Sequence, residues 1–145
     1  MNTAKFRLAL ALTVLLSGSL QPIPGQESPK KSVWDGVYTT GQAARGETAY
    51  RESCASCHGA DMDGKGPTPP LAGAEFLSIW NGRNLGQLFE KMQDSMPADR
   101  PGQLAKSANA AILAYMLKAN KFPEGAAELA ASPDALREIV FRSAK

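Results

Sequence analysis

Both cysteines of the chain and its only histidine lie within five consecutive residues, Cys54-Ala55-Ser56-Cys57-His58. This C-x-x-C-H pattern is the attachment sequence for a c-type haem. Two thiols at this spacing can reach the two vinyl groups of one porphyrin, and the adjacent imidazole is then carried under the iron. The motif therefore predicts one haem c, bonded covalently through Cys54 and Cys57 and bound at its iron by His58.

Three other uses of a C-x-x-C pair fit the sequence less well. A thioredoxin-like redox pair needs strand–helix–strand surroundings, whereas this pair closes a helical segment. A zinc site needs four ligands, usually with a second pair. A structural disulfide at this spacing would close a small loop with little entropic benefit. Covalent haem attachment is therefore the favoured chemistry.

The other side of the iron needs a different residue type, because the chain has no second histidine. A methionine thioether is the usual partner, and the candidates are Met62, Met92, Met96 and Met116. Met62 lies too near the motif in the chain to reach over the porphyrin edge. Met92 and Met116 lie on apolar helix faces, where methionine normally packs in the core. Met96 precedes Pro97, which favours an extended conformation that can present its sulfur; the alternative is that Met96 continues the apolar stripe of its helix.

Helical periodicity dominates the segments that must position these ligands. The sequence predicts helices from near Thr40 to near Cys54, over 75–80, from the N-cap Asn84 to Pro97, from the N-cap Ser107 to about Asn120, and from Ser132-Pro133 with Leu136, Ile139 and Val140 inward. Phe76, Ile79 and Trp80 share one face of the second helix. Residues 59–73 are rich in Gly and Pro and read as a long loop. The predicted class is all-α, with about four to five helices around one covalently bound haem.

The charge of the chain disfavours nucleic acid as a class of partner. The net charge is only +2 and the longest basic run is Lys30-Lys31, too short to neutralise a phosphate backbone. We therefore expect no nucleic-acid partner. Near-neutral charge also offers little electrostatic steering toward another protein.

The N-terminus has the pattern of a secretory signal peptide. Lys5 and Arg7 precede an apolar stretch over 8–16, and small residues follow it. This stretch is about half the ~20 residues that cross a bilayer, which favours a cleaved signal over a permanent anchor. We expect a signal peptide over 1–25, cleaved between about 19 and 27, then an N-terminal segment over 26–39, a core over 40–122 and an extension over 123–145. The mature chain would be periplasmic or secreted, not stably inserted in a membrane, and monomeric.

The chain resembles the class I monohaem cytochromes c, and most of all the small cytochromes and cytochrome domains associated with quinoprotein (PQQ) dehydrogenases. The resemblance covers about Val33 to Phe141 and is carried by VWDGVYTTGQAARG, CASCHGADM, PLAGAEFLSIWNG and SMPADRPGQL. It implies an N-terminal helix that crosses a C-terminal helix, with Gly46 and Tyr50 of the first meeting Tyr115 of the last. A glycine inside a helix costs about 1 kcal/mol relative to alanine, so this crossing accounts for Gly46; the alternative is that Gly46 is simply tolerated.

The resemblance also implies the surroundings of the haem. The P-x-L pattern places Pro69, whose carbonyl would accept a hydrogen bond from the haem histidine, and Leu71 beside the haem, with Pro70 as a rival to Pro69. Trp80, Arg83 and Arg100 would reach the haem propionates, although Trp80 is equally consistent with a core aromatic. Trp34, Val37 and Tyr38 would cover apolar haem surface, or else pack only on the C-terminal helix.

Iron with two strong protein ligands has no vacant position for a substrate, which indicates a one-electron carrier and not an enzyme. The expected donor is a dehydrogenase, possibly a quinoprotein, and the expected acceptor is an oxidase or another cytochrome. The alternative is a haem-based sensor or peroxidase in which Met96 is weakly bound or absent. A structural or assembly subunit is a further alternative.

Overall fold

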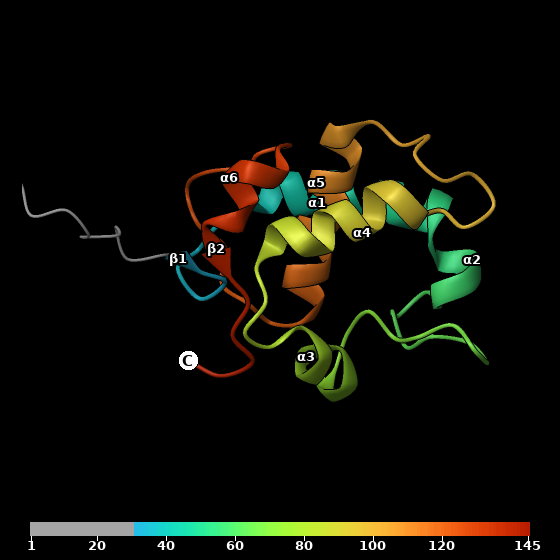
Figure 1. Ribbon diagram of the computed structural model, residues 1–145, viewed down its shortest axis with the longest axis horizontal. Helices are drawn as coiled ribbons and strands as arrows, with labels where there is room; N and C mark the ends of the chain where they lie inside the picture. Colours follow the sequence, from blue (N-terminus) through green and yellow to red (C-terminus); the bar gives the residue numbers. More distant parts are fainter. Residues whose placement is uncertain (1–30) are drawn as a thin grey trace, which may run out of the picture.

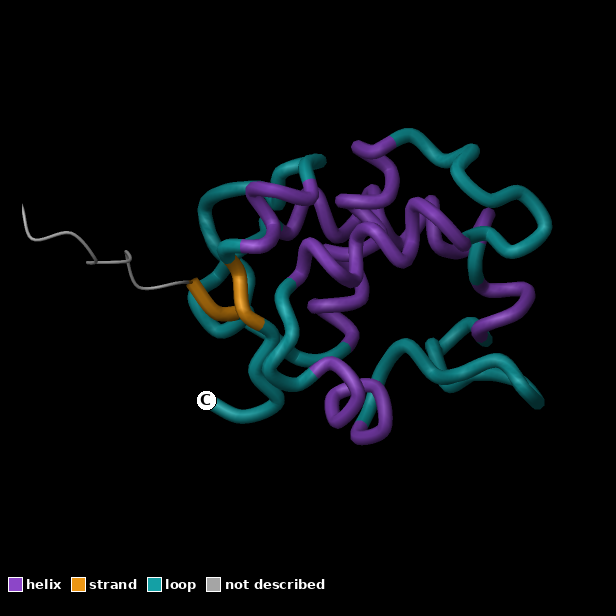
Figure 2. The backbone as a smooth tube through the Cα atoms, in the orientation of Figure 1, coloured by secondary structure: helices purple, strands orange, loops and turns teal. Residues whose placement is uncertain are grey.

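The computed structural model describes residues 31–145, and this part of the chain forms six helices and two short strands (Figure 1). The elements are β1 (Lys31–Ser32), α1 (Thr40–Ser53), α2 (Ala55–His58), α3 (Ala74–Trp80), α4 (Leu85–Ser95), α5 (Lys106–Ala119), α6 (Pro133–Arg137) and β2 (Ile139–Val140). The predicted all-α class is confirmed, and Figure 2 shows how little strand accompanies the helices. There are more helices than expected because the C-x-x-C-H segment forms a turn of its own, α2. The expected signal peptide lies outside the described residues.

The two longest helices, α1 and α5, pack against each other and form the centre of the fold. Gly46 lies at their contact point, where a Cβ atom would collide with the carbonyl group of Ala111. The rings of Tyr50 and Tyr115 meet beside it, with centroids 5.6 Å apart. The close helix crossing implied by the resemblance is therefore present, and it explains why a glycine stands inside α1.

The ends of the other long helices follow local signals to different degrees. Asn84 caps α4 in a capping box, in which its side chain accepts from the Gln87 N–H and the Gln87 side chain accepts from the Asn84 N–H. The prediction that Ser107 caps α5 is wrong. That helix begins at Lys106, with Ala105 as an N-cap that makes no side-chain hydrogen bond. Burial of the helix against α1 outweighs the capping preference there.

Residues after Phe122 wrap around the helical core. The Gln42 side chain of α1 bonds the backbone of Leu129 twice, donating to its carbonyl at 2.9 Å and accepting from its N–H at 2.8 Å. Helix α6 packs on α4. Its predicted start at Ser132-Pro133 is confirmed, but the prediction that Ile139 and Val140 belong to it is wrong. These two residues form β2, which pairs in parallel with β1.

An aromatic cluster closes the end of the molecule that contains β1 and β2. Phe141 is fully buried, and its ring meets those of Phe76 and Phe122 edge-on, with centroids 5.7 and 5.2 Å apart. Trp34 meets Phe122 at 4.8 Å, and the Tyr38 hydroxyl donates to the Phe122 carbonyl at 2.7 Å. Trp34 and Tyr38 therefore contact the chain at Phe122, just after α5, and their role in covering haem surface stays a prediction.

Across residues 31–145, each helix is too short or too polar to cross a bilayer.

Candidate haem site

The C-x-x-C-H motif lies at the junction of α1 and α2, at the far end of the molecule from the two strands (Figure 1). Cys54 ends α1 and also precedes α2, Cys57 lies within α2, and His58 is its last residue. Cys54 is half-buried, Cys57 is exposed, and neither forms a disulfide. Burial raises the pKa of the Cys54 thiol to about 11, with a smaller contribution from Cys57. Both sulfurs are thus free to form thioether bonds.

The His58 imidazole is buried, at 7% exposure, and has a defined partner. Its Nδ1 lies 2.9 Å from the carbonyl oxygen of Pro69. A carbonyl oxygen can only accept, so Nδ1 is the donor in this contact and, in the neutral imidazole, Nε2 is the nitrogen with the lone pair. The structure pairs His58 with Pro69, not with the neighbouring Pro70.

The loop after the motif brings Pro69 back to His58. Gly64 donates its N–H to the His58 carbonyl at 2.9 Å. It has a φ of +78°, and a Cβ at this position would lie 2.9 Å from the Pro70 nitrogen and 3.0 Å from the Pro69 carbonyl carbon. Only glycine meets both conditions without strain. The tight return of the loop, and hence the Pro69 contact, depends on this residue.

Tyr50 ties the motif to the helix crossing. Its hydroxyl donates to the Gly59 carbonyl at 2.7 Å, and the residue is fully buried. Burial, followed by the charge of Cys54, raises the pKa of Tyr50 above the ordinary tyrosine value. The hydroxyl therefore stays protonated and remains a donor throughout the neutral range. The sequence pointed to Tyr50 only as a packing residue, because its hydroxyl partner depends on the path of the loop.

Among the methionines, Met96 differs from the other three candidates. Met62, Met92 and Met116 are buried, with at most 8% of each residue exposed. Met96 is half-buried and forms the C-cap of α4, with the extended backbone angles φ −128° and ψ 148°. The predicted extended conformation before Pro97 is therefore present.

The predicted propionate contacts fall into two groups. The Arg83 guanidinium lies over the Trp80 ring, 5.4 Å from its centroid, so these two side chains form one unit between α3 and α4. Arg100 pairs instead with its neighbour Asp99 at 3.2 Å in an exposed position.

Leu71 is half-buried, and its N–H donates to the Met62 carbonyl at 2.9 Å. Ile79, on the same helix as Trp80, is 48% exposed, so the apolar face of α3 is only partly covered.

One buried polar residue near the loop was not singled out from the sequence. Asn120 follows α5 and is 8% exposed. Its side chain accepts from the Gly73 N–H and donates to the carbonyls of Leu71 and Met116. An asparagine after a helix usually reads as a C-cap, which gives no indication of these longer-range bonds.

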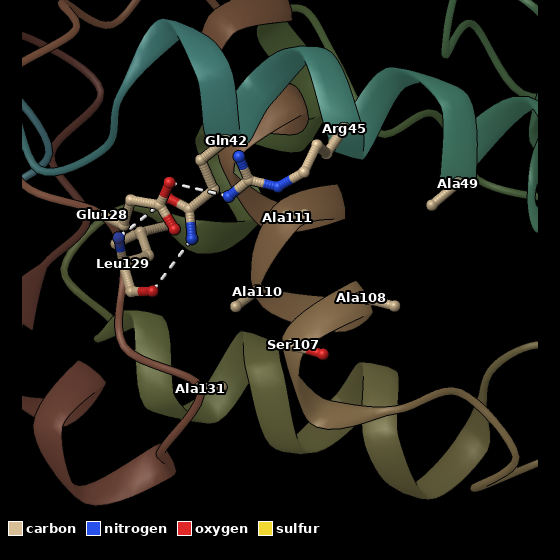
Figure 3. Close-up of a pocket in the computed structure, with 10 residues that line it drawn as sticks. All are labelled: Gln42, Arg45, Ala49, Ser107, Ala108, Ala110, Ala111, Glu128, Leu129 and Ala131. Carbon is tan, nitrogen blue, oxygen red and sulfur yellow. Dashed lines mark hydrogen bonds and ion pairs between the residues drawn. The ribbon is translucent and has the colours of Figure 1, made fainter.

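Two pockets lie away from the motif. The larger, of about 460 Å³, lies between α1, α5 and the segment around Leu129, and the Arg45–Glu128 ion pair spans it (Figure 3). The other, of about 400 Å³, lies beside β1 and α6. Neither is lined by Cys54, Cys57 or His58.

The donor set at the motif fits haem c. Two thiols without a disulfide stand beside a buried imidazole whose Nδ1 is already engaged, so that Nε2 is the nitrogen left for iron. The fold and the motif together define a c-type cytochrome domain, with haem c bonded through Cys54 and Cys57. Residues 41–116, more than half of the chain, match the family described as "Cytochrome C oxidase, cbb3-type, subunit III", and the chain belongs to this family.

Two known proteins are similar to parts of the chain. Cytochrome c-554(547) of Halothiobacillus neapolitanus is 58% identical over 33 residues, which are 23% of this chain and 36% of that protein. The chain thus matches only about a third of the length of this relative. The crystal structure of the sulfane dehydrogenase SoxCD from Paracoccus pantotrophus aligns with a TM-score of 0.48 and 20% identity, over 88% of this chain and 68% of that one.

Proposed function

We propose that the protein is an exported one-electron carrier whose haem c is bound by His58 and Met96. The observation that carries this proposal is the contact between His58 Nδ1 and the Pro69 carbonyl at 2.9 Å. It fixes the tautomer and the orientation of the imidazole and increases its basicity at Nε2. An imidazole held in this way is prepared to bind iron in both oxidation states with little rearrangement.

Met96 is proposed for the opposite side because of its position and its exposure. It is the least buried of the four candidate methionines, and the chain leaves α4 in an extended conformation at this residue. The others serve the core, where a flexible thioether fills space. When bound, haem c supplies an iron that takes up and releases one electron.

The other candidate residues would orient the haem, and the electron donor and acceptor would be other redox proteins. We assign Leu71 to the apolar surroundings of the haem, and the Trp80–Arg83 unit to its propionates, where an indole N–H and a guanidinium are suitable donors. The donor would be a dehydrogenase, possibly a quinoprotein, and the acceptor an oxidase or another cytochrome. The family description, which names an oxidase, supports an acceptor of this class. Export is supported by the charged and apolar pattern over 5–16.

The test is a pair of matched substitutions in the haem-loaded protein. Met96→Leu keeps apolar volume but removes the thioether, and Met92→Leu makes the same change one helical turn earlier, at a buried position. We expect Met96→Leu to lower the reduction potential and to make the reduced protein bind carbon monoxide rapidly. Met92→Leu and the unaltered protein should resist carbon monoxide.

Three results would contradict the proposal. Rapid carbon monoxide binding by the unaltered protein would favour the sensor or peroxidase alternative. Equal effects of Met92→Leu and Met96→Leu would show that Met96 has no special role at the iron. Absence of covalently bound haem after maturation would overturn the proposed function as a whole.

A further inference from the structure

We propose that Asn120, at the C-terminus of α5, is the positioning residue that holds the Pro69 carbonyl against His58 and thereby tunes the haem iron. This inference rests on the proposed role of His58 as an iron ligand. Pro69 and Pro70 have no backbone N–H, so this stretch cannot anchor itself through its own donors. Its position depends on the residues at its two ends.

The first end is fixed within the loop itself. Lys65 and Thr68 exchange two backbone hydrogen bonds, at 3.2 and 2.9 Å. The second end, Leu71 to Gly73, is held on one side by the Met62 carbonyl, which accepts from Leu71 at 2.9 Å and from Ala72 at 3.2 Å. Both of these anchors belong to the same loop. Neither is a hydrogen bond to one of the long helices, although the Met62 side chain is itself buried in the core.

Asn120 connects this end of the loop to α5 by hydrogen bonds. Its Nδ2 donates to the Leu71 carbonyl at 3.0 Å and to the Met116 carbonyl of its own helix at 2.8 Å. Its Oδ1 accepts from the Gly73 N–H at 3.0 Å. Both amide hydrogens and the carbonyl oxygen are thus used, in a residue only 8% exposed. A buried amide with every donor satisfied is costly to disturb, which makes this contact a stiff link.

Asn120 bonds Leu71, which is two residues after Pro69, and Gly73, which directly precedes α3. Gly73 is the N-cap of α3, which carries Trp80. Releasing Leu71 and Gly73 therefore frees from α5 the chain that directly follows Pro69 and leads into α3. A looser Pro69 carbonyl makes the imidazole a weaker donor to iron, which favours the reduced form. The predicted consequence is a more positive reduction potential.

The test compares Asn120→Ala with Gln42→Ala in the haem-loaded protein. Gln42 is the matched control: a buried amide, 3% exposed, that makes two hydrogen bonds to the backbone of Leu129, on a different segment. Because His58 is the only histidine, its Nδ1 proton gives a single signal in ¹⁵N-histidine-labelled reduced protein. We expect Asn120→Ala to speed exchange of this proton with solvent on the order of tenfold and to raise the potential. Gln42→Ala should destabilise the fold without either change.

Other results would overturn the inference. Equal acceleration by the two variants would mean that general destabilisation is the cause. No acceleration by Asn120→Ala would mean that the Pro69 contact does not depend on Asn120. In either case the unaltered protein still shows the His58 signal of an iron-bound imidazole, so the proposed function survives. A missing signal in the unaltered protein would instead count against the proposed function.

A measurement on the unaltered protein covers the case in which Asn120→Ala does not fold. We expect the Gly73 N–H and the His58 Nδ1–H to exchange with the same dependence on urea, because one opening exposes both. Exchange of the His58 proton while Gly73 stays protected would overturn the inference.

Discussion

The two ends of this cytochrome are held together by different forces. The end with β1 and β2 is closed by edge-to-face aromatic contacts around the fully buried Phe141. The end with the C-x-x-C-H motif is held by single hydrogen bonds to backbone carbonyls, at Pro69 and Gly59. Apolar packing is strong but without direction, whereas a hydrogen bond fixes an orientation at a smaller energy. The molecule places directional contacts where an imidazole must be aimed.

The largest effect is expected at the aromatic end. Phe141→Ala removes a fully buried ring that contacts Phe76 and Phe122, and should lower the free energy of unfolding by about 3–5 kcal/mol. Urea denaturation of the haem-loaded protein measures this loss. Phe141→Leu, which keeps more apolar volume, should lose less. A cost below about 1 kcal/mol for the alanine variant would contradict the proposed contrast.

A smaller effect is expected at the motif end. Tyr50→Phe keeps the buried ring but leaves the Gly59 carbonyl with only its longer bond from the Met62 N–H, at 3.4 Å, and should lower the free energy of unfolding by about 1–2 kcal/mol. The same urea titration measures it, and Tyr115→Phe, in the half-buried ring that Tyr50 contacts, is the control. Equal losses in the two variants would show that the loss is not specific to the Tyr50 hydroxyl and its bond to Gly59.

The smallest effect is expected at an ion pair between α1 and the segment that follows Phe122. Arg45 and Glu128 lie 2.7 Å apart, but their side chains are 60% and 49% exposed. Removing the charge with Arg45→Met, which keeps the apolar stem, should change the free energy of unfolding by at most about 0.5 kcal/mol. The difference should vanish in about 1 M salt, where screening is nearly complete. A larger difference that persists in salt would show that this pair is structurally essential.

The parts of the fold that the sequence predicted well depend on local signals. The start of α4 follows from Asn84 and Gln87, which lie close together in the chain and bond each other. The end of α1 is fixed by the motif that follows it. Gly46 was informative because its cost in a helix requires a compensating contact, and Ala111 supplies it.

The parts that could not be predicted depend on residues far apart in the chain. Ile139 and Val140 have a helical pattern, but β1 pairs with them from the other end of the described chain. Trp34 had two possible environments, and only the folded chain shows that Phe122 is its neighbour. At the motif, the sequence named His58 and Pro69, but the bonds of Asn120 to Leu71 and Gly73 require the helix and the loop to be folded together.

The parallel pairing of β1 with β2 has a practical consequence for handling the protein. It brings Lys31 beside Ile139, so both ends of the described chain emerge at the pole opposite α2 (Figure 1). A linker joined beyond Lys145 would fasten the molecule to an electrode or a resin by that pole. The end with α2, which carries the C-x-x-C-H motif, would then lie away from the support. This orientation leaves the motif end open to redox partners in solution and is unfavourable for direct electron transfer to the support.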